Sequence, residues 1–222
     1  MARPLEARWL GCVPYNQAWA LQRNLAVARL ASQIPDTLLL LEHPHVYTLG
    51  RTSLEEHILV SREVLAQRGA TIERIDRGGE VTYHGPGQLV AYPIILLEGQ
   101  ERHLDRLVWK LEQAIIATLG HYGARGHRRD GQHGVWVEQA KIASIGLHVR
   151  RWVVTHGLAI NVAPQMDYFT YINPCGHADS VMTSLAQVVS PCPPVQDVAS
   201  VLTARFAELF DRALTPIPVP AL

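Results

Sequence analysis

Cysteine is scarce in this sequence, with three residues, Cys12, Cys175 and Cys192, among 222. Their small number and wide spacing exclude a disulfide framework, and no two of them have the CxxC spacing of a metal site. Long hydrophobic runs are lacking too: the longest, LVAYPIILL, has nine residues, whereas a membrane-spanning helix needs about 18. The first residues contain no apolar core of signal-peptide length. These absences predict a cytoplasmic protein with reduced thiols and no contact with a membrane.

An excess of one charge is also missing. Basic and acidic residues number 20 each, so the formal net charge is +0. This balance gives no electrostatic reason to expect a nucleic acid or an anionic membrane as a partner. Hydrophobic residues make up 48% of the chain and charged residues 18%, which is typical of a globular protein. Because no repeat or linker divides the sequence, we expect one domain over residues 1–222, with a proline-rich tail from about residue 215.

Apolar periodicity predicts a mixture of helices and strands. Helices are expected over residues 17–33, 61–69, 103–123 and 195–213. Strands are expected over residues 37–44, 46–50, 71–76, 89–97, 134–138, 141–151 and 152–162, and loops over 123–134 and 163–179. Asn16 is the expected cap of the first helix, Pro35 its stop, and Gly69 the left-handed end of the second. Short connections between the last three strands indicate antiparallel neighbours. The fold class is therefore predicted to be α+β, a mixed α/β arrangement.

A glycine-rich segment, RGGEVTYHGPGQ, covers residues 77–88. It matches neither a Walker A motif nor a dinucleotide-binding fingerprint. Its four glycines let the backbone adopt positive φ angles and approach another group closely. One interpretation is a long hairpin connection. The other is a loop around a ligand, in which Tyr83 supplies an aromatic wall, His84 a polar contact and Arg77 a charge.

The strand that begins at Lys141 carries small residues. Strict alternation predicts one face with Lys141, Ala143 and Ile145 and the other with Ile142, Ser144 and Gly146. A lysine at the start of an apolar strand is usually an edge residue whose ammonium reaches solvent. The next strand has Gly157 and Ala159 on one face. Two adjacent strands with small residues could form the floor of a slot for an apolar chain.

Cys175 lies in the stretch YINPCGH, between a proline and a glycine. Cys12 and Cys192 are interpreted as small hydrophobic residues. An exposed thiol on a stiff turn is instead typical of a nucleophile. With an ordinary pKa of about 8.5, roughly 3% of such a thiol is ionised at pH 7. A nearby ammonium, such as that of Lys141, or a histidine that lowered this pKa by about two units would raise the fraction to about three quarters.

Four motifs occur in order over residues 77–176: RGGEVTYHGPGQLVAYP, KIASIGLHV, THGLAINV and NPCG, preceded by HPHVYTLGR. Together they resemble the lipoyl(octanoyl) transferase family. The resemblance implies a mostly antiparallel sheet flanked by helices, similar to the catalytic domains of biotin and lipoate protein ligases. It also implies transfer of an octanoyl group from octanoyl-acyl carrier protein to a lysine of a lipoyl domain. The acceptors would be the lipoyl domains of 2-oxoacid dehydrogenase complexes and the glycine cleavage H protein, and the enzyme would be a monomer without a cofactor.

The resemblance also assigns roles to residues. Cys175 matches the nucleophile that holds the acyl group, and Lys141 matches the lysine that lowers its pKa. Once Cys175 is acylated, Lys141 could accept the proton of the incoming amine. The acyl-binding residues implied by the motifs are Arg77, Gly78, Gly79, Glu80, Val81, Thr82, Tyr83, His84, Ser144, Ile145, Gly146, Gly157, Leu158 and Ala159.

Other functions stay open at this point. An ATP-dependent lipoate or biotin ligase would share the fold but leave Cys175 idle. A carrier-protein-binding module would form no adduct on Cys175 at all. A cysteine hydrolase would pair Cys175 with His84, His148 or His156, although no CGSCW-type signature is present. A zinc site would use His121, His127 and His133, which a solvated loop explains equally well.

Overall fold

The computed structural model describes residues 2–173 and 181–215. Its larger sheet contains β1 (Arg3–Cys12), β2 (Asp36–Glu42), β6 (Gln88–Ile94), β7 (Gly126–Arg129), β8 (Gln132–Val137), β9 (Ala140–Arg150), β10 (Val153–Asn161) and β11 (Arg212–Thr215). A smaller sheet contains β3 (Val46–Leu49), β4 (Thr71–Arg74) and β5 (Thr82–His84). The α-helices are α1 (Tyr15–Leu30), α2 (Arg62–Gln67), α3 (Leu104–His121), α4 (Leu185–Val188) and α5 (Val195–Leu209). None of these helices is both long enough and apolar enough to span a bilayer.

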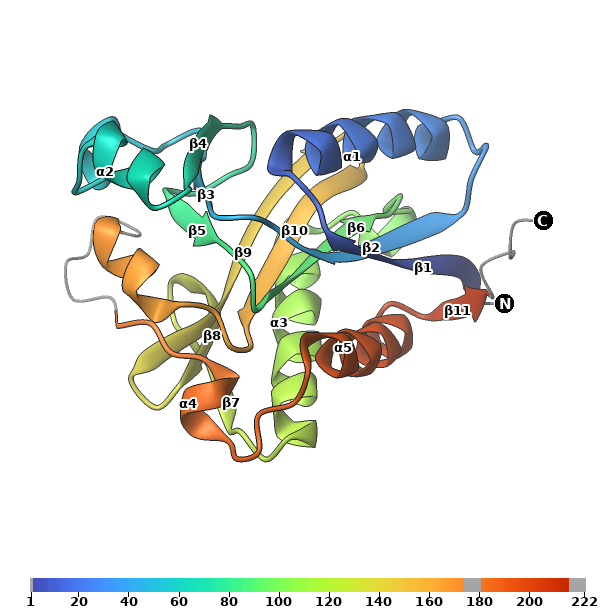
Figure 1. The fold of residues 1–222 in the computed structure, drawn as a ribbon. Helices are drawn as coiled ribbons and strands as arrows, with labels where there is room; N and C mark the ends of the chain where they lie inside the picture. The colour runs from blue at the N-terminus through green and yellow to red at the C-terminus, as the bar shows by residue number, and fades with distance from the viewer. Residues whose placement is uncertain (1, 174–180, 216–222) are drawn as a thin grey trace, which may run out of the picture.

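The larger sheet separates two helical layers. Its strand order is β11-β1-β2-β6-β10-β9-β8-β7, with α1 over one face and α3 and α5 over the other (Figure 1). In β2, Leu38 and Leu40 pack on the side of α3 and α5, whereas Leu39 and Leu41 pack on the side of α1. Because both faces are covered, the central strands read as continuous apolar runs in the sequence.

The predicted fold class is confirmed. In the larger sheet, each neighbouring pair from β2 through β6, β10, β9 and β8 to β7 is antiparallel, and β1 pairs in parallel with β2 and with β11. The predicted antiparallel run of residues 134–162 is therefore confirmed. Gly69 has a φ of +69°, as expected for the left-handed end of a helix. That residues 1–222 form one domain stays a prediction, and the predicted tail beyond Thr215 lies outside the described residues.

Several local predictions are wrong. Helix α1 begins at Tyr15 after Pro14, not behind an Asn16 cap, and ends at Leu30, before Pro35. Residues 3–12 form β1, which was not predicted from the sequence. Residues 123–134, expected to be a loop, contain β7 and the start of β8, an edge hairpin whose polar residues mask its strand character. The described part of the expected loop 163–179 contains a 3₁₀ helix, η3 (Met166–Tyr171).

The two faces predicted for the strand after Lys141 are also wrong, because β9 contains a bulge. Val135 of β8 pairs with Ala143, but the next residue, Trp136, pairs with Lys141. Two residues of β9 therefore oppose one of β8. Ile142 and Ala143 consequently both pack in the core with α3. Lys141 is turned to the opposite face, where Ser144 lies.

The smaller sheet carries the glycine-rich segment. Its strand order is β4-β3-β5, and β5 is part of the segment that was predicted to be a loop. Tyr47 of β3 and Tyr83 of β5 are buried against Tyr168 and Phe169 of η3. This aromatic cluster holds residues 77–84 beside the larger sheet (Figure 1).

Candidate active site

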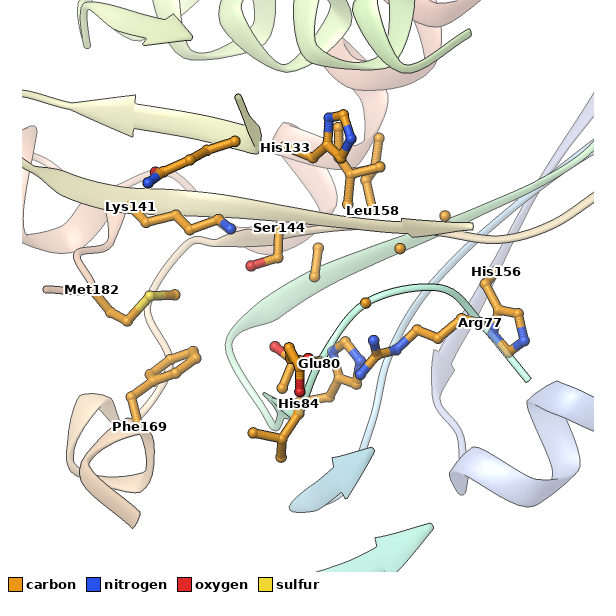
Figure 2. A pocket seen from close by; sticks show the side chains of 18 of the residues that line it. Arg77, Glu80, His84, His133, Lys141, Ser144, His156, Leu158, Phe169 and Met182 are labelled. Atoms are coloured by element: carbon orange, nitrogen blue, oxygen red, sulfur yellow. The ribbon is translucent and has the colours of Figure 1, made fainter. Parts of the chain in front are cut away.

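A cavity of about 510 Å³ lies between the glycine-rich segment and strands β9 and β10. Most of the predicted acyl-binding residues line it: Arg77, Gly79, Glu80, Val81, Thr82, His84, Ser144, Ile145, Gly146, Gly157, Leu158 and Ala159. Lys141 also lines it. Figure 2 shows Lys141 and Ser144 on the side of β9, and Glu80, His84 and Arg77 on the side of the glycine-rich segment.

Small residues face each other across the floor of the cavity. Gly157 pairs with Gly146, and Ala159 pairs with Ser144. A Cβ atom at Gly146 would lie 2.9 Å from Cδ of Arg77, and one at Gly157 would lie 2.0 Å from the carbonyl oxygen of Ala91. Both glycines are therefore required for the strands and the Arg77 side chain to pack as they do.

Gly78 and Tyr83 are not among the residues that line the cavity. The Gly78 N–H donates to the carbonyl oxygen of Leu147 at 2.9 Å and so ties the glycine-rich segment to β9. Tyr83 is fully buried behind the segment, where its hydroxyl lies 2.7 Å from Nδ1 of His45. Its ring stacks on Tyr168. Tyr83 supports the segment from behind instead of forming the aromatic wall that was expected.

Arg77 places a buried positive charge at the cavity. Its Nη2 donates to the carbonyl oxygen and to Oγ1 of Thr48, both at 2.8 Å. Its Nη1 donates to the carbonyl oxygen of Gly78 at 3.0 Å. These bonds orient the planar guanidinium, which a lysine could not reproduce.

A chain of hydrogen bonds joins His84 to the strand of Lys141. Nδ1 of His84 lies 2.7 Å from Oε1 of Gln88, and Nε2 of Gln88 donates to Oδ1 of Asn161 at 2.8 Å. Nδ2 of Asn161 donates to the carbonyl oxygen of Thr183 at 2.9 Å. The Thr183 N–H in turn donates to the carbonyl oxygen of Lys141 at 2.9 Å. The glycine-rich segment and the backbone of Lys141 therefore belong to one polar network.

Lys141 is held between β8 and the segment that follows residue 180. Its N–H donates to the carbonyl oxygen of Val181 at 2.8 Å, and its Nζ lies 5.0 Å from the ring centroid of Trp136. Phe169, Val181 and Met182 also line the cavity. Cys175, the predicted nucleophile, lies outside the described residues. Its proximity to Lys141 therefore stays a prediction.

Part of the cavity wall comes from residues that were not predicted to bind the acyl chain. Tyr15, Tyr92 and His156 line it, and they come from α1, β6 and β10. The Tyr15 hydroxyl lies 3.2 Å from Nδ1 of His156, whose Nε2 lies 2.8 Å from Oδ1 of Asp76. The Tyr92 hydroxyl lies within hydrogen-bond distance of Nε2 of His43, at 2.8 Å. No contiguous motif connects these residues, so only the folded chain reveals the wall.

Burial keeps two histidines beside the cavity neutral. It lowers the pKa of His43 to about 4, against the opposing hydrogen bond to Val13. Burial, reinforced by the nearby His43, lowers the pKa of His84 to about 3. Since Gln88 Nε2 donates elsewhere, Gln88 Oε1 accepts from His84, which fixes the proton on Nδ1. The ring therefore has its lone pair on Nε2.

The stability of the protein should fall between pH 7 and pH 5. In this range the unfolded histidines, with a pKa of about 6.5, bind protons that buried His43 and His84 do not, so the free energy of unfolding decreases as the pH falls. Each histidine should contribute a loss of roughly 2 kcal/mol. Urea unfolding at pH 7 and at pH 5 measures this loss of unfolding free energy. A His84→Gln variant should lose the share of this dependence that His84 contributes, roughly 2 kcal/mol. His121→Gln, at an exposed position, should retain the full dependence, and equal dependence in all three proteins would contradict the assignment.

The three histidines of the possible zinc site come from different elements. His121 ends α3, His127 lies in β7 and His133 in β8. Of these, His133 lines the cavity. Within residues 2–173 and 181–215, no three His, Cys, Asp or Glu side chains are grouped as metal ligands.

A family model described as the lipoyl protein ligase A/B catalytic domain matches residues 14–207. The chain belongs to this family. Within the lipoyl protein ligase A/B family it is 47% identical over 212 residues to an octanoyltransferase of Chloroflexus aggregans, covering 94% of this chain and 96% of that one. It is 44% identical to an octanoyltransferase of Solibacter usitatus, covering 94% of each. The predicted membership is confirmed, and with it the expectation of an octanoyltransferase enzyme.

Solved structures of lipoate and biotin protein ligases share the fold at low identity. A putative lipoate protein ligase from T. acidophilum with bound lipoic acid has a TM-score of 0.76 and 16% identity, covering 97% of this chain and 88% of that chain. A biotin protein ligase from Aquifex aeolicus has a TM-score of 0.55 and 13% identity, covering 92% and 70%. The predicted similarity to the catalytic domains of lipoate and biotin ligases is confirmed at the level of the fold.

Proposed function

We propose that this chain moves an octanoyl group from octanoyl-acyl carrier protein to a lysine of a lipoyl-accepting domain, through a thioester on Cys175. The observation that carries the proposal is the placement of Lys141. The bulge in β9 turns Lys141 onto the same face as the small-residue floor of the cavity. The described residues on either side of Cys175 in the sequence support it as well, because Phe169 precedes it, Val181 follows it, and both line the cavity.

The cavity suits a short acyl chain. Val81, Phe169 and Met182 line the cavity together with the glycine and alanine floor, within a volume of about 510 Å³. Burial of an octanoyl tail contributes about 0.8 kcal/mol per methylene. Since one methylene more or less changes binding by only about 1 to 3 kcal/mol, selection for eight carbons is a preference, and neighbouring lengths react more slowly.

In the first half-reaction, the Cys175 thiolate attacks the carbonyl carbon of the donor thioester. The bond between the acyl carbon and the phosphopantetheine sulfur breaks, and the Lys141 ammonium protonates the departing thiolate. One thioester replaces another, so the step needs no ATP. Lys141 is left as a neutral amine beside an acylated cysteine.

In the second half-reaction, the amine of the acceptor lysine attacks the acyl carbon of the Cys175 thioester. A C–N bond forms, the bond to the Cys175 sulfur breaks, and neutral Lys141 takes the proton of the attacking amine. This restores the ammonium and thiolate with which the cycle began. The acceptors in this proposal are lipoyl domains of 2-oxoacid dehydrogenase complexes and the glycine cleavage H protein, and the enzyme works as a cytoplasmic monomer.

Intact-mass analysis without nucleotide tests this function. The protein mixed with octanoyl-acyl carrier protein should gain the mass of one octanoyl group, and peptide mapping should find it on Cys175. Addition of a lipoyl domain should then remove the adduct and acylate the domain. Acylation of the domain from free octanoate only when ATP is present would instead indicate a ligase. Steady release of octanoic acid with water as the acceptor would indicate a cysteine hydrolase, and binding of the carrier without any adduct would indicate a binding module.

A further inference from the structure

The Lys141 side chain runs across Gly134 and ends at the indole of Trp136. A Cβ atom at Gly134 would lie 2.6 Å from Cε and 3.3 Å from Nζ of Lys141. Nζ lies 5.0 Å from the ring centroid of Trp136. Gly134 and Trp136 both belong to β8, the strand against which β9 forms its bulge. The path of the lysine from backbone to ammonium is therefore defined by β8.

Gly134 is fixed in a position that leaves this path open. Its φ of +133° is one that residues with a side chain rarely adopt. Its N–H donates to Oε1 of Glu112 at 3.1 Å, and Glu112 is itself paired with Arg128 at 2.9 Å. Helix α3 therefore holds the Gly134 peptide, and the missing side chain provides the space through which Lys141 passes.

Trp136 supplies the surface on which the ammonium rests. Its indole is buried, with 4% exposure. A cation near the face of an indole is attracted by the negative ring face, and tryptophan is the strongest of the aromatic residues in this respect. The Arg129 guanidinium lies 5.4 Å from the same ring centroid and donates to Oε1 of Gln139 at 2.7 Å. The Trp136 ring therefore lies near two cations, Lys141 and Arg129.

We propose that Trp136 is a positioning residue, which together with the gap at Gly134 holds the Lys141 ammonium at the wall of the cavity. The catalytic consequence rests on the proposed function, but the contact itself does not. Several charged and titratable side chains share the cavity wall with Lys141. Arg129 and His133 come from the β7–β8 hairpin, and the others are Arg77, Glu80, His84, Tyr15, Tyr92 and His156.

Lysine NMR tests the contact directly, because the chain contains only two lysines, Lys110 and Lys141. In protein labelled with 13C at lysine Cε, the Lys141 Hε signals should be displaced upfield by the indole ring current. Trp136→Leu should remove this displacement and leave the Lys110 signals in place, and Trp136→Phe should retain part of it. Lys141→Arg assigns the signals. Unchanged Lys141 signals in a folded Trp136→Leu protein would overturn the proposal.

Thiol alkylation tests the consequence. Iodoacetamide modification of Cys175, followed by peptide mass analysis against pH, should move to higher pH by about half a unit to one unit in Trp136→Leu, and by less in Trp136→Phe. The control is Trp109→Leu, because Arg128 lies 4.7 Å from the Trp109 ring, which is half exposed and does not line the cavity. Trp109→Leu should leave the profile unchanged.

The two proposals fail in different ways. If Lys141→Ala leaves the alkylation profile unchanged, the role of Lys141 in the proposed function is wrong, whatever Trp136 does. If Lys141→Ala shifts the profile but Trp136→Leu does not, Lys141 acts on the thiol without help from Trp136, and the positioning role is overturned. Thermal unfolding of each variant confirms that the protein compared is folded.

Discussion

Replacing Cys175 with alanine should abolish the octanoyl adduct and slow octanoyl transfer by at least about a thousandfold. Alanine cannot form a thioester, so the donor thioester would have to meet the acceptor amine directly in the cavity. The measurements are the intact mass after mixing with octanoyl-acyl carrier protein and the rate of acylation of a lipoyl domain. Circular dichroism and thermal unfolding should show the same fold as in the unmodified protein.

The other two cysteines provide matched controls for this variant. Burial and the nearby Glu42 raise the pKa of Cys12, and burial raises the pKa of Cys192. Both thiols should therefore be largely protonated at pH 7, so neither competes as a nucleophile. Cys12→Ala and Cys192→Ala should each keep the full adduct. An adduct of undiminished yield in Cys175→Ala, or transfer at the normal rate, would refute the covalent route.

Lys141→Ala should slow formation of the acyl-enzyme at pH 7 by roughly twentyfold and shift the alkylation profile of Cys175 upward by about two pH units. The sign follows from the charge: removal of a neighbouring cation destabilises the thiolate, so the thiol pKa rises and less thiolate is present at neutral pH. The second half-reaction should also lose the base that accepts the amine proton, which typically accounts for a factor of about 10² to 10⁴. The reaction should recover partly at pH 9.

Lys141→Arg separates the two roles. A guanidinium keeps the positive charge but does not give up its proton near neutral pH. The alkylation profile should stay near that of the unmodified protein, while transfer from Cys175 to the lipoyl domain should remain as slow as in Lys141→Ala. Quenched-flow measurement of each half-reaction distinguishes them. An alkylation profile of Lys141→Arg shifted as far as that of Lys141→Ala would contradict the electrostatic role, and transfer to the lipoyl domain at the normal rate would contradict the proton-transfer role.

The parts of the fold that follow from local pattern were predictable. β2 and β6 read as continuous apolar runs because helices cover both faces, and α3 shows an apolar stripe at helical spacing. β1 carries no comparable signal. Its side chains are mostly half-buried, and its partners, β2 and β11, include one near the far end of the chain. Only the tertiary pairing makes residues 3–12 a strand.

The candidate site was predictable where its residues are contiguous. The glycine-rich segment, the small residues of β9 and those of β10 each form a short continuous motif in the sequence. The structure brings these three motifs to one cavity. The face of Lys141 was not predictable, because a bulge depends on how β8 pairs and not on β9 alone. Trp136 and Tyr92 also line the cavity, but they come from β8 and β6, and only the pairing of the strands brings them together.

The amide network fixes which ligand groups His84 can meet. Gln88 and Asn161 each accept on their oxygen and donate from their nitrogen, so every bond from His84 to the Thr183 carbonyl runs in one direction. Exchange of the His84 tautomer would require both buried amides to rotate and would leave the Thr183 carbonyl facing an oxygen. The imidazole is thereby locked by Gln88 and Asn161, which do not line the cavity. A substrate group that binds its Nε2 must donate a hydrogen, and an ester or ketone oxygen in that position would be repelled.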